Sequence, residues 1–554
     1  MTEIVPPDGY GTHKVENQPP DLRDYNVFER DLVLAEALTR EGGGWGRDSA
    51  VALGARAGSA EVLDWARQAN RHVPELHSHD RFGNRRDEVV YHPAWHELMR
   101  LGVTYAVHAL PWRQTKGGAH VVRAALAFLL NQGENGVCCP IAMTFAAVPA
   151  LRAQPELSAE WEPRLLSTEY DPRFMPAARK TGCIFGMAIT EKQGGSDVQA
   201  NASTARPAES GSSEEYLLTG HKWFCSAPMS DGVLTLARTP AGLTCFLVPR
   251  WLPDGTANRF LIQRLKDKLG NRANASAEIE YADTWAHRVG PEGEGVRTIV
   301  PMIHHTRLDA ALSAAAVMRQ AVVQALHHAA HRNAFGARLV DQPLMRNVLA
   351  DLALESEAAT VMAMRLARGF DDAAKDETAG TFARLATAIT KFWICKRAPT
   401  VVAEAMECLG GNGYVEDGLL PRLYREAPVN GIWEGTGNVI CLDILRTIER
   451  EPAALPAFFD AVKQAKGGNR HLDRHIRAIH KMLASPLDEP AGARRTVEGL
   501  ALALQASLLV RHAPAPVADA FCATRLGGEG GRTLGTLPDA ADTGAILKRA
   551  WPVD

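Results

Sequence analysis

The sequence predicts an α+β fold that is mostly α-helical, with a small β-rich region between two helical regions. At 554 residues the chain is too long for one hydrophobic core, so we expect several domains. Residues 182–290 contain short β-type runs separated by clusters of Gly, Pro, Asp and Asn, which indicate a small β domain. Residues 295–450 contain long Ala-rich amphipathic segments, and further helical stretches follow them, so we expect an extra C-terminal helical domain.

The composition is that of a soluble globular protein, with 46% apolar residues. A net charge of -3 predicts no strong overall attraction to nucleic acid, so such a partner would have to meet a local basic patch. The nine cysteines show no metal-like pairing and no secretory signal precedes them, which favours a reducing cytoplasm. No apolar run is long enough to span a bilayer, so we expect no membrane partner.

The first 180 residues are predicted to form an arm followed by helices. The polar stretch Asn17–Leu22 suits an arm that lies on another surface, and a helical pattern starts at Asp31. The run Gly42–Gly46 lacks the Lys and Ser/Thr of a phosphate-binding loop, so we interpret it as a plain loop. His92 and His96 lie four residues apart, but no third ligand completes a zinc site, so we expect no metal.

Five short runs make up the predicted β domain. Thr190 and Ser196 lie on loops between them, where hydroxyl and backbone N–H groups suit a ligand's ring and phosphates. Phe224 either offers its aromatic face to a ligand or, together with Trp223, is buried in a strand. The runs are Cys183–Ile189, Glu215–Thr219, Val233–Leu236, Leu243–Pro249 and Ala277–Tyr281.

The following region is predicted to be a helical bundle whose last helix begins after a loop with one carboxylate, Glu434. Apolar neighbours raise the pKa of a carboxylate toward neutrality, where a general base works best. Gly435 and Gly437 allow unusual backbone angles and leave room for a bulky ligand. The same loop also fits a plain turn before a helix. The predicted helices are Thr306–Arg332, Gln342–Phe370, Phe382–Glu407 and the segment after Trp433.

Two upstream stretches favour the catalytic interpretation of this loop. Met187–Asp197 followed by Gly220–Ser226 resembles the flavin-binding signatures of the acyl-CoA dehydrogenase family, in which a loop like that around Glu434 carries the catalytic base. Arg332–Gly336 and Cys408–Tyr414 follow in the order of the family. Several ordered motifs together are strong evidence, whereas each alone is weak.

The resemblance spans residues 90–450 and implies an acyl-CoA dehydrogenase-like fold that binds FAD. It implies that Glu434 takes the α-proton of an acyl-CoA thioester while the flavin accepts hydride. It also implies that Arg332 and the pair Gly410–Gly411 reach the cofactor from a neighbouring subunit. Many members carry Gln where this chain has Glu407, and a carboxylate cannot donate as an amide can, so we expect part of the adenine-side contact to differ here. The implied cofactor-binding residues are Met187, Thr190, Gly195, Ser196, Phe224, Ser226, Arg332, Phe335, Gln342, Gly410, Gly411, Trp433, Thr436 and Asn438.

The C-terminal tail extends beyond the usual family fold and carries a basic stripe. Helical patterns cover Leu455–Lys466, Arg470–Leu483 and Thr496–Arg511, and Gly467–Gly468 is expected to divide the stripe into two segments. A local basic face attracts a phosphate backbone, although a solvated helix surface is the plain alternative. The stripe consists of Lys463, Lys466, Arg470, Arg474, Arg477 and Lys481, of which the last four fall on one helix face.

Further stretches resemble the AidB branch of the family, a branch associated with the adaptive response to DNA alkylation. They are Asn17–Pro20, Glu41–Trp45, Phe224–Pro228, Arg264–Arg272 and the basic tail. This resemblance implies double-stranded DNA as a partner of the C-terminal domain, with Arg446 in the contact, and a homotetramer built as a dimer of dimers. We expect an arm and helical domain over 1–180, a β domain over 181–290, a bundle with the flavin and catalytic loop over 291–446, and a DNA-binding domain over 447–554.

The sequence therefore predicts a cytoplasmic, FAD-containing, DNA-binding protein of the alkylation-damage response with weak, isovaleryl-CoA-like dehydrogenase activity. The alternative is a metabolic short- or branched-chain acyl-CoA dehydrogenase whose tail serves oligomerisation. The basic tail favours the first hypothesis, and the Glu434 loop is compatible with both. The physiological substrate, the electron acceptor, any DNA sequence preference, and whether DNA is repaired or only protected stay open.

Overall fold

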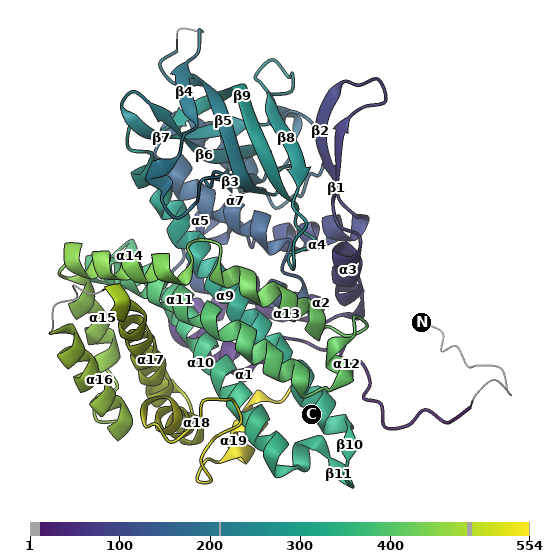
Figure 1. Ribbon diagram of the computed structural model, residues 1–554, viewed down its shortest axis with the longest axis vertical. Helices are drawn as coiled ribbons and strands as arrows, with labels where there is room; N and C mark the ends of the chain where they lie inside the picture. The colour runs from purple at the N-terminus through teal and green to yellow at the C-terminus, as the bar shows by residue number, and fades with distance from the viewer. Residues whose placement is uncertain (1–11, 210–211, 485–489, 553–554) are drawn as a thin grey trace.

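The computed structural model describes residues 12–209, 212–484 and 490–552, and it confirms the mostly helical α+β fold with extra C-terminal helices. The molecule is elongated (Figure 1), with the strands β1 to β9 at one end and the long helices, together with the small β10–β11 hairpin, at the other. None of the helices in the described part of the chain combines the length and hydropathy needed to cross a bilayer.

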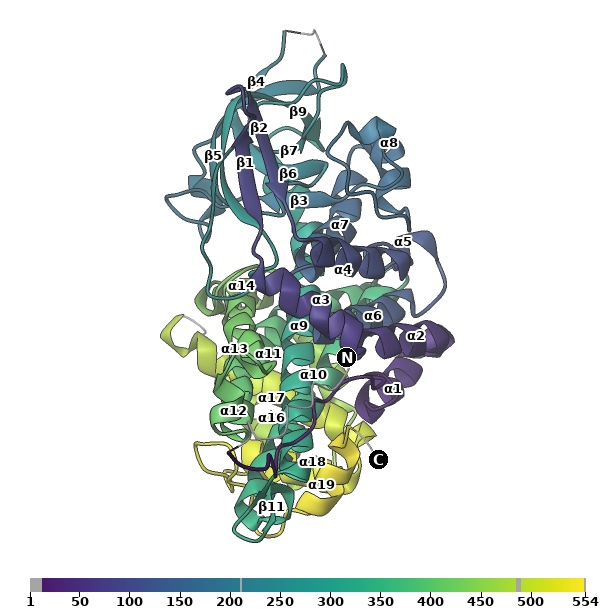
Figure 2. The ribbon, with the colours of Figure 1, turned by 90° about the vertical axis from the view of Figure 1, so that its right-hand side faces the viewer.

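The described part of the predicted arm, from residue 12, runs along the outside of the molecule to the far end of the long helices (Figure 2). Asn17 exchanges two hydrogen bonds with the backbone of Asn333, at 2.7 and 2.8 Å, and the Pro20 carbonyl lies 2.8 Å from Nε2 of His327. These contacts confirm that the arm lies on another surface of the chain.

The N-terminal region is mostly helical, but it contains two features that the sequence did not predict. Gly42–Gly46 is not a plain loop: after α1 (Leu32–Leu38) the chain forms a wide π-type turn and then a 3₁₀ turn, with a kink at Gly42, which takes a φ of 93°. Gly46 is packed so closely that a Cβ there would lie 2.3 Å from the Val122 side chain. A β hairpin follows α3, and its largely exposed strands lack the apolar alternation that reveals a strand. The elements are α1 (Leu32–Leu38), α2 (Arg47–Ala57), α3 (Ala60–Arg71), β1 (Glu75–His79), β2 (Arg85–Val90), α4 (Pro93–Thr104), α5 (Leu110–Arg113), α6 (Ala119–Gly133), α7 (Cys138–Leu151) and α8 (Pro155–Leu165).

The β region closes on itself as a barrel. Its strand order is β3-β6-β4-β5-β9-β7, β8 pairs with β9, and an additional β6–β7 pairing completes the ring. All five predicted runs form strands, whereas β4 and β8 were not predicted. The strands are β3 (Phe185–Ala188), β4 (Thr204–Pro207), β5 (Glu215–Ser226), β6 (Gly232–Thr239), β7 (Gly242–Pro249), β8 (Phe260–Leu265) and β9 (Ser276–Val289).

Four predicted bundle helices are present, and the first begins earlier than expected, at Gly295. A small hairpin follows this helix, and two short helices precede the Glu434 loop. The elements are α9 (Gly295–His331), β10 (Asn333–Ala334), β11 (Ala337–Arg338), α10 (Pro343–Ala373), α11 (Glu377–Glu407), α12 (Gly411–Tyr414), α13 (Leu420–Glu426) and α14 (Gly437–Arg450).

The tail packs directly on the bundle, and its apolar side chains belong to the same core as those of the bundle. Two arginines reinforce this docking by pairing with buried carboxylates of α10: Arg525 Nε lies 3.0 Å from Glu355, and Arg549 Nε lies 2.9 Å from Glu357. The predicted break at Gly467–Gly468 separates the first two tail helices. The tail helices are α15 (Ala454–Lys463), α16 (Arg470–Leu483), α17 (Ala493–His512), α18 (Ala515–Phe521) and α19 (Thr543–Ala550).

Candidate active site

The Glu434 loop, between α13 and α14, has a strained backbone that two cations stabilise. Glu434 has a φ of 59°, which is uncommon for a residue with a side chain, and Gly435 has a φ of 107°. The Arg307 guanidinium donates to the Glu434 carbonyl at 3.1 Å, and the Lys391 ammonium donates to the Gly435 carbonyl. Arg307 comes from α9 and Lys391 from α11, so the bundle fixes the position of the carboxylate.

The Glu434 carboxylate is half-buried and accepts a hydrogen bond of 2.7 Å from the Thr306 hydroxyl. Loss of solvent raises the pKa of this carboxyl above its ordinary value, while Thr306, Arg307 and Lys391 lower it in part. Raised basicity in a fixed orientation is what a general base near neutral pH requires. The Glu434 carboxylate is thus suited to remove a weakly acidic proton.

The residues on either side of Glu434 are held by separate contacts. The Trp433 indole donates to the buried Asn430 side chain at 3.0 Å. Thr436 is exposed at the N-terminal cap of α14, and Asn438 accepts a hydrogen bond of 2.8 Å from Arg494 of α17. The C-terminal helices therefore reach the predicted cofactor side of the Glu434 loop, which the sequence alone did not indicate.

The loop after β3 carries Thr190, Gly195 and Ser196, and it is anchored from behind by a buried ion pair. Glu191 and Lys222 are fully buried and lie 2.7 Å apart. A Cβ on Gly195 would lie 2.4 Å from the Thr190 hydroxyl, so only glycine allows this turn. The sequence analysis did not single out this ion pair. The signal that could have predicted it is that one of the two flavin-motif stretches contains an acid, Glu191, and the other a base, Lys222.

The ends of β3 and β5 present side chains toward the same region. Met187 is half-buried on β3, and Ser226, at the end of β5, lies with its hydroxyl 3.4 Å from that of Ser276. Phe224 exposes 51% of its surface, so a buried strand pair is the wrong interpretation of this residue. An aromatic face of this kind is available to stack on a planar ligand.

A second group of predicted cofactor residues lies at the opposite end of α9. Arg332 caps this helix and donates to the Asn17 carbonyl, Phe335 is 99% exposed, and Gln342 donates to the Ala334 carbonyl at 2.7 Å. Gly410 and Gly411 are exposed, and a Cβ added at either glycine would have no neighbouring atom within 4 Å.

Within one chain the two groups do not meet. Thr306, which contacts Glu434, and Arg332 are separated by most of α9, and a helix rises about 1.5 Å per residue. They therefore lie on the order of 40 Å apart along the axis. Figure 1 shows the β10–β11 hairpin at the end of the molecule opposite β3, and α12 in the same helical half, between β3 and the hairpin. One flavin dinucleotide cannot contact both groups of the same chain.

Each group by itself fits part of a flavin dinucleotide. The β3–β5 group offers an exposed aromatic ring, hydroxyl groups and a glycine loop, which suit a flat heterocycle and its polar chain. The hairpin group offers a guanidinium and open glycine backbone, which suit phosphate oxygens. Glu407, at the end of α11 before these glycines, is exposed and adds a carboxylate that cannot donate.

The predicted basic face is present and exposed. Arg470, Arg474 and Arg477 line a hollow on α16 together with His471 and Glu529. Arg446 is also exposed, on α14, the helix that leads toward α15. All six residues of the stripe are exposed: Lys463, Lys466, Arg470, Arg474, Arg477 and Lys481.

Comparisons with known proteins match the order of the helical, β and helical regions along the chain. Three family models match successive parts of the chain: the adaptive response protein AidB N-terminal domain over residues 17–172, the acyl-CoA dehydrogenase middle domain over 186–284, and the acyl-CoA dehydrogenase C-terminal domain over 293–449. The chain is 47% identical to the putative acyl-CoA dehydrogenase AidB of Escherichia coli (strain K12), over 94% of this chain and 96% of that protein.

Two comparisons involve Caenorhabditis elegans. The chain is 31% identical to acyl-CoA dehydrogenase family member 11 of that organism, over 78% of this chain and 71% of that protein. It also resembles the crystal structure of Caenorhabditis elegans ACDH-11 in complex with C11-CoA, with a TM-score of 0.84, 27% identity and 93% of each chain covered. Coverage of 93% means that the similarity includes most of the tail.

Proposed function

Because this chain belongs to the acyl-CoA dehydrogenase family, in its AidB branch, we propose that it is an FAD-containing protein of the DNA-alkylation response that binds double-stranded DNA and has weak acyl-CoA dehydrogenase activity. The family membership confirms the resemblance seen in the ordered motifs. It also makes the chain an acyl-CoA dehydrogenase-type oxidoreductase of a FAD-dependent family. The DNA partner, the residue roles and the assembly are our proposals.

In the proposed reaction, Glu434 removes the α-proton of an acyl-CoA thioester. Thr306 orients the carboxylate, and Arg307 and Lys391 hold the loop carbonyls so that the carboxylate stays in place. The chemistry that bound FAD supplies is acceptance of hydride from the β-carbon. An isovaleryl-CoA-like thioester, short and branched, is the substrate that we propose.

We propose that the cofactor site is built from two subunits. The group around Phe224 and Glu434 would hold the flavin ring, while the partner subunit supplies the adenine and pyrophosphate side through the equivalents of Arg332, Phe335, Gln342, Gly410 and Gly411. The separation of about 40 Å between the two groups in one chain supports this arrangement. A dimer of dimers would contain such paired sites, and it would join the basic faces of several subunits.

The hollow on α16 is the observation that carries the DNA-binding proposal. The imidazole of His471 is buried, with Arg470 Nε 3.2 Å from its Nε2 and an Arg474 terminal nitrogen 2.9 Å from its Nδ1. A neutral imidazole has one acceptor nitrogen, so one of these contacts places two N–H donors against each other. A phosphate above the hollow would accept from the guanidinium groups and remove this conflict.

Binding of duplex DNA by the flavin-loaded protein, measured at several salt concentrations, tests this proposal. We expect the double substitution Arg474→Ala and Arg477→Ala to weaken binding and to reduce the slope of log affinity against log salt by about 2. The matched control replaces the exposed Arg81 and Arg86 of the β1–β2 region, which removes the same charge far from α16. Equal effects of both pairs would show that only net charge matters.

The alternative, a metabolic acyl-CoA dehydrogenase whose tail builds the oligomer, is favoured by two observations. Caenorhabditis elegans ACDH-11, crystallised with C11-CoA, resembles this chain over 93% of its length, so the tail is not by itself a mark of DNA binding. The buried pairs of Arg525 and Arg549 with α10 also give the tail a structural role. Absence of DNA binding at moderate salt would favour this alternative, and a screen of acyl-CoA thioesters would follow.

A further inference from the structure

The N-terminal arm follows α9 toward the second group of predicted cofactor residues (Figure 2). Three contacts mark its course, and their partners advance along α9 and into β10 by about two helical turns each time. The contacts are the Tyr25 hydroxyl with the Gln320 side chain at 2.9 Å, the Pro20 carbonyl with Nε2 of His327 at 2.8 Å, and the Asn17 side chain with the Asn333 backbone at 2.7 and 2.8 Å. The arm therefore runs antiparallel to α9 and reaches the β10–β11 hairpin.

Two consecutive arm residues link two separate pieces of the predicted adenine side. The Asn17 side chain both accepts from and donates to the Asn333 backbone of the hairpin. The Gln18 side-chain oxygen accepts from the Asn412 amide at 3.4 Å, directly after the glycine pair at 410–411. Among the residues that the structure describes, no hydrogen bond joins residues 333–338 to residues 410–414 directly. The arm is thus the hydrogen-bonded link between the hairpin and this glycine turn.

Asn17 also contacts the cation of this group, Arg332. A terminal nitrogen of the Arg332 guanidinium donates to the Asn17 carbonyl. Across the described part of the chain, the guanidinium has no other hydrogen bond and no carboxylate partner. Because Arg332 is half-exposed, the rest of its donor fork is free to bind a phosphate, in an orientation that the arm sets.

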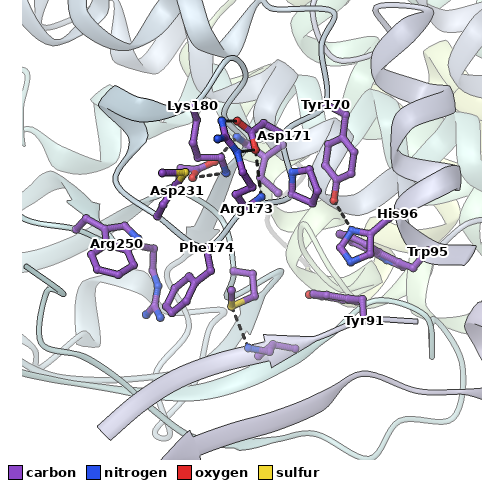
Figure 3. Close-up of a pocket in the computed structure, with 16 residues that line it drawn as sticks. Tyr91, Trp95, His96, Tyr170, Asp171, Arg173, Phe174, Lys180, Asp231 and Arg250 are labelled. Carbon is purple, nitrogen blue, oxygen red and sulfur yellow. Dashed lines mark hydrogen bonds and ion pairs between the residues drawn. The ribbon is translucent and has the colours of Figure 1, made fainter. Parts of the chain in front are cut away.

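The cavity beside α4 gives a contrast. Charged side chains in its wall pair with one another, Lys180 with Asp231 at 2.7 Å and Arg173 with Asp171 at 2.6 Å (Figure 3). These four charges are satisfied within the chain. Arg332 instead keeps free donors on the side of the molecule where the glycine backbone is open.

We propose that Asn17 and Gln18 are positioning residues of the cofactor site, for the adenine and pyrophosphate side of FAD. This inference rests on the proposed function, since it takes Arg332 and the glycine pair as cofactor residues. Asn17 fixes the guanidinium and the hairpin, and Gln18 fixes the glycine turn, so these groups are in place before the cofactor binds. Preorganisation of this kind lowers the cost of binding.

The arm also brings an amide to a turn that lacks one at position 407. Glu407 lies three residues before Gly410 and its carboxylate can only accept. The Gln18 amide uses its oxygen toward Asn412, so its nitrogen is available to donate to the cofactor. We therefore assign to Gln18 the donor role that Glu407 cannot fill.

Titration of the FAD-free full-length protein with FAD and, separately, with riboflavin tests the inference. Riboflavin lacks the adenine and the phosphates, so it reports on the ring side alone. Asn17→Gly keeps the left-handed backbone, where Asn17 has a φ of 58°, and removes both side-chain bonds to Asn333. We expect this variant to bind FAD about tenfold more weakly and to bind riboflavin as the wild type does. Gln18→Ala should weaken FAD binding with the same selectivity.

The matched control is Val15→Gly, which makes the arm equally flexible at a residue that is 73% exposed and leaves the bonds of Asn17 and Gln18 intact. It should bind FAD as tightly as the wild type, and the melting temperatures of the FAD-free variants should agree. An equal loss of FAD affinity in Val15→Gly, or an equal loss of riboflavin affinity in Asn17→Gly, would show a general effect of the arm and overturn the inference.

Arg332→Ala, titrated in parallel, separates this inference from the proposed function. If Arg332→Ala weakens FAD binding while Asn17→Gly and Gln18→Ala do not, the role of the arm is wrong and the cofactor residues stand. If Arg332→Ala binds FAD like the wild type, the proposed two-subunit cofactor site is wrong, and the inference falls with it.

Discussion

Replacement of Thr306 by Val should make Glu434 a stronger base that is protonated over a wider pH range. The Thr306 hydroxyl has one proton and three acceptors within reach: the Glu434 carboxylate at 2.7 Å and the carbonyls of Met302 and Ile303 at 3.2 and 3.1 Å. The shortest of these contacts goes to Glu434. Because the bond stabilises the ionised carboxylate, its loss raises the pKa of Glu434 further.

The size of the effect follows from the burial of the carboxylate. A hydrogen bond to a charged group contributes about 1.5–3 kcal/mol, and a half-buried carboxylate such as Glu434 belongs at the lower end, about 1.5 kcal/mol. A difference of 1.36 kcal/mol corresponds to about tenfold in the ionisation equilibrium. On the acid side of its titration, the variant should therefore hold about tenfold less ionised Glu434 than the wild type.

The assay is anaerobic stopped-flow reduction of the yellow flavin by isovaleryl-CoA across a pH series. We expect the acid limb of the rate profile of Thr306→Val to move to higher pH, with recovery of the rate at alkaline pH. Thr306→Ser keeps the hydroxyl and should follow the wild type. Superimposable profiles of the Val variant and the wild type would refute a role of Thr306 in setting the basicity of Glu434.

Three further substitutions test the site and its assembly. Glu434→Gln should abolish acyl-CoA oxidation and retain flavin. Burial raises the pKa of Glu434, so the ionised carboxylate destabilises the folded protein above that pKa. The melting temperature of the variant at pH 8 should therefore not fall below that of the wild type. Oxidation by this variant would place the base elsewhere. Co-expression of Glu434→Gln with an inactive Arg332→Ala variant should restore about a quarter of the wild-type activity, since mixed dimers contain one intact site; no recovery would argue against sites shared between subunits. Lys222→Met should cost about 3–5 kcal/mol in urea unfolding and weaken FAD retention, because Glu191 stays buried without its partner. The double variant with Glu191→Gln should recover part of that loss, and additive losses would exclude the pair as the cause.

Local patterns were enough to predict most of the helices and five of the barrel strands, all except β4 and β8. A helix such as α16 buries one face, so its basic and apolar residues recur at spacings visible within fourteen residues. The β1–β2 hairpin and the turns around Gly42 escaped prediction for the opposite reason. The hairpin is mostly exposed, and the turns depend on close packing against Val122 of α6.

The candidate site divides in the same way. The sequence by itself predicted the Glu434 loop as the catalytic one, because the Glu434 carboxylate and its glycines are contiguous. Only the tertiary structure showed that Thr306, 128 residues away, donates a hydrogen bond to that carboxylate, and that Arg494 of the tail contacts Asn438. Such contacts depend on how whole helices pack, and no period within one segment encodes them.

The sequence by itself determined the family, the carboxylate and the basic stripe, since each is carried by residues close together in the chain. The tertiary structure decided what these residues face: two groups of predicted cofactor residues separated by most of α9, and a hollow of arginines around His471. The physical reason is that hydrogen-bond partners and burial depend on the environment that distant segments create around a side chain, whereas the residue type sets only its capacity to donate, accept or carry charge.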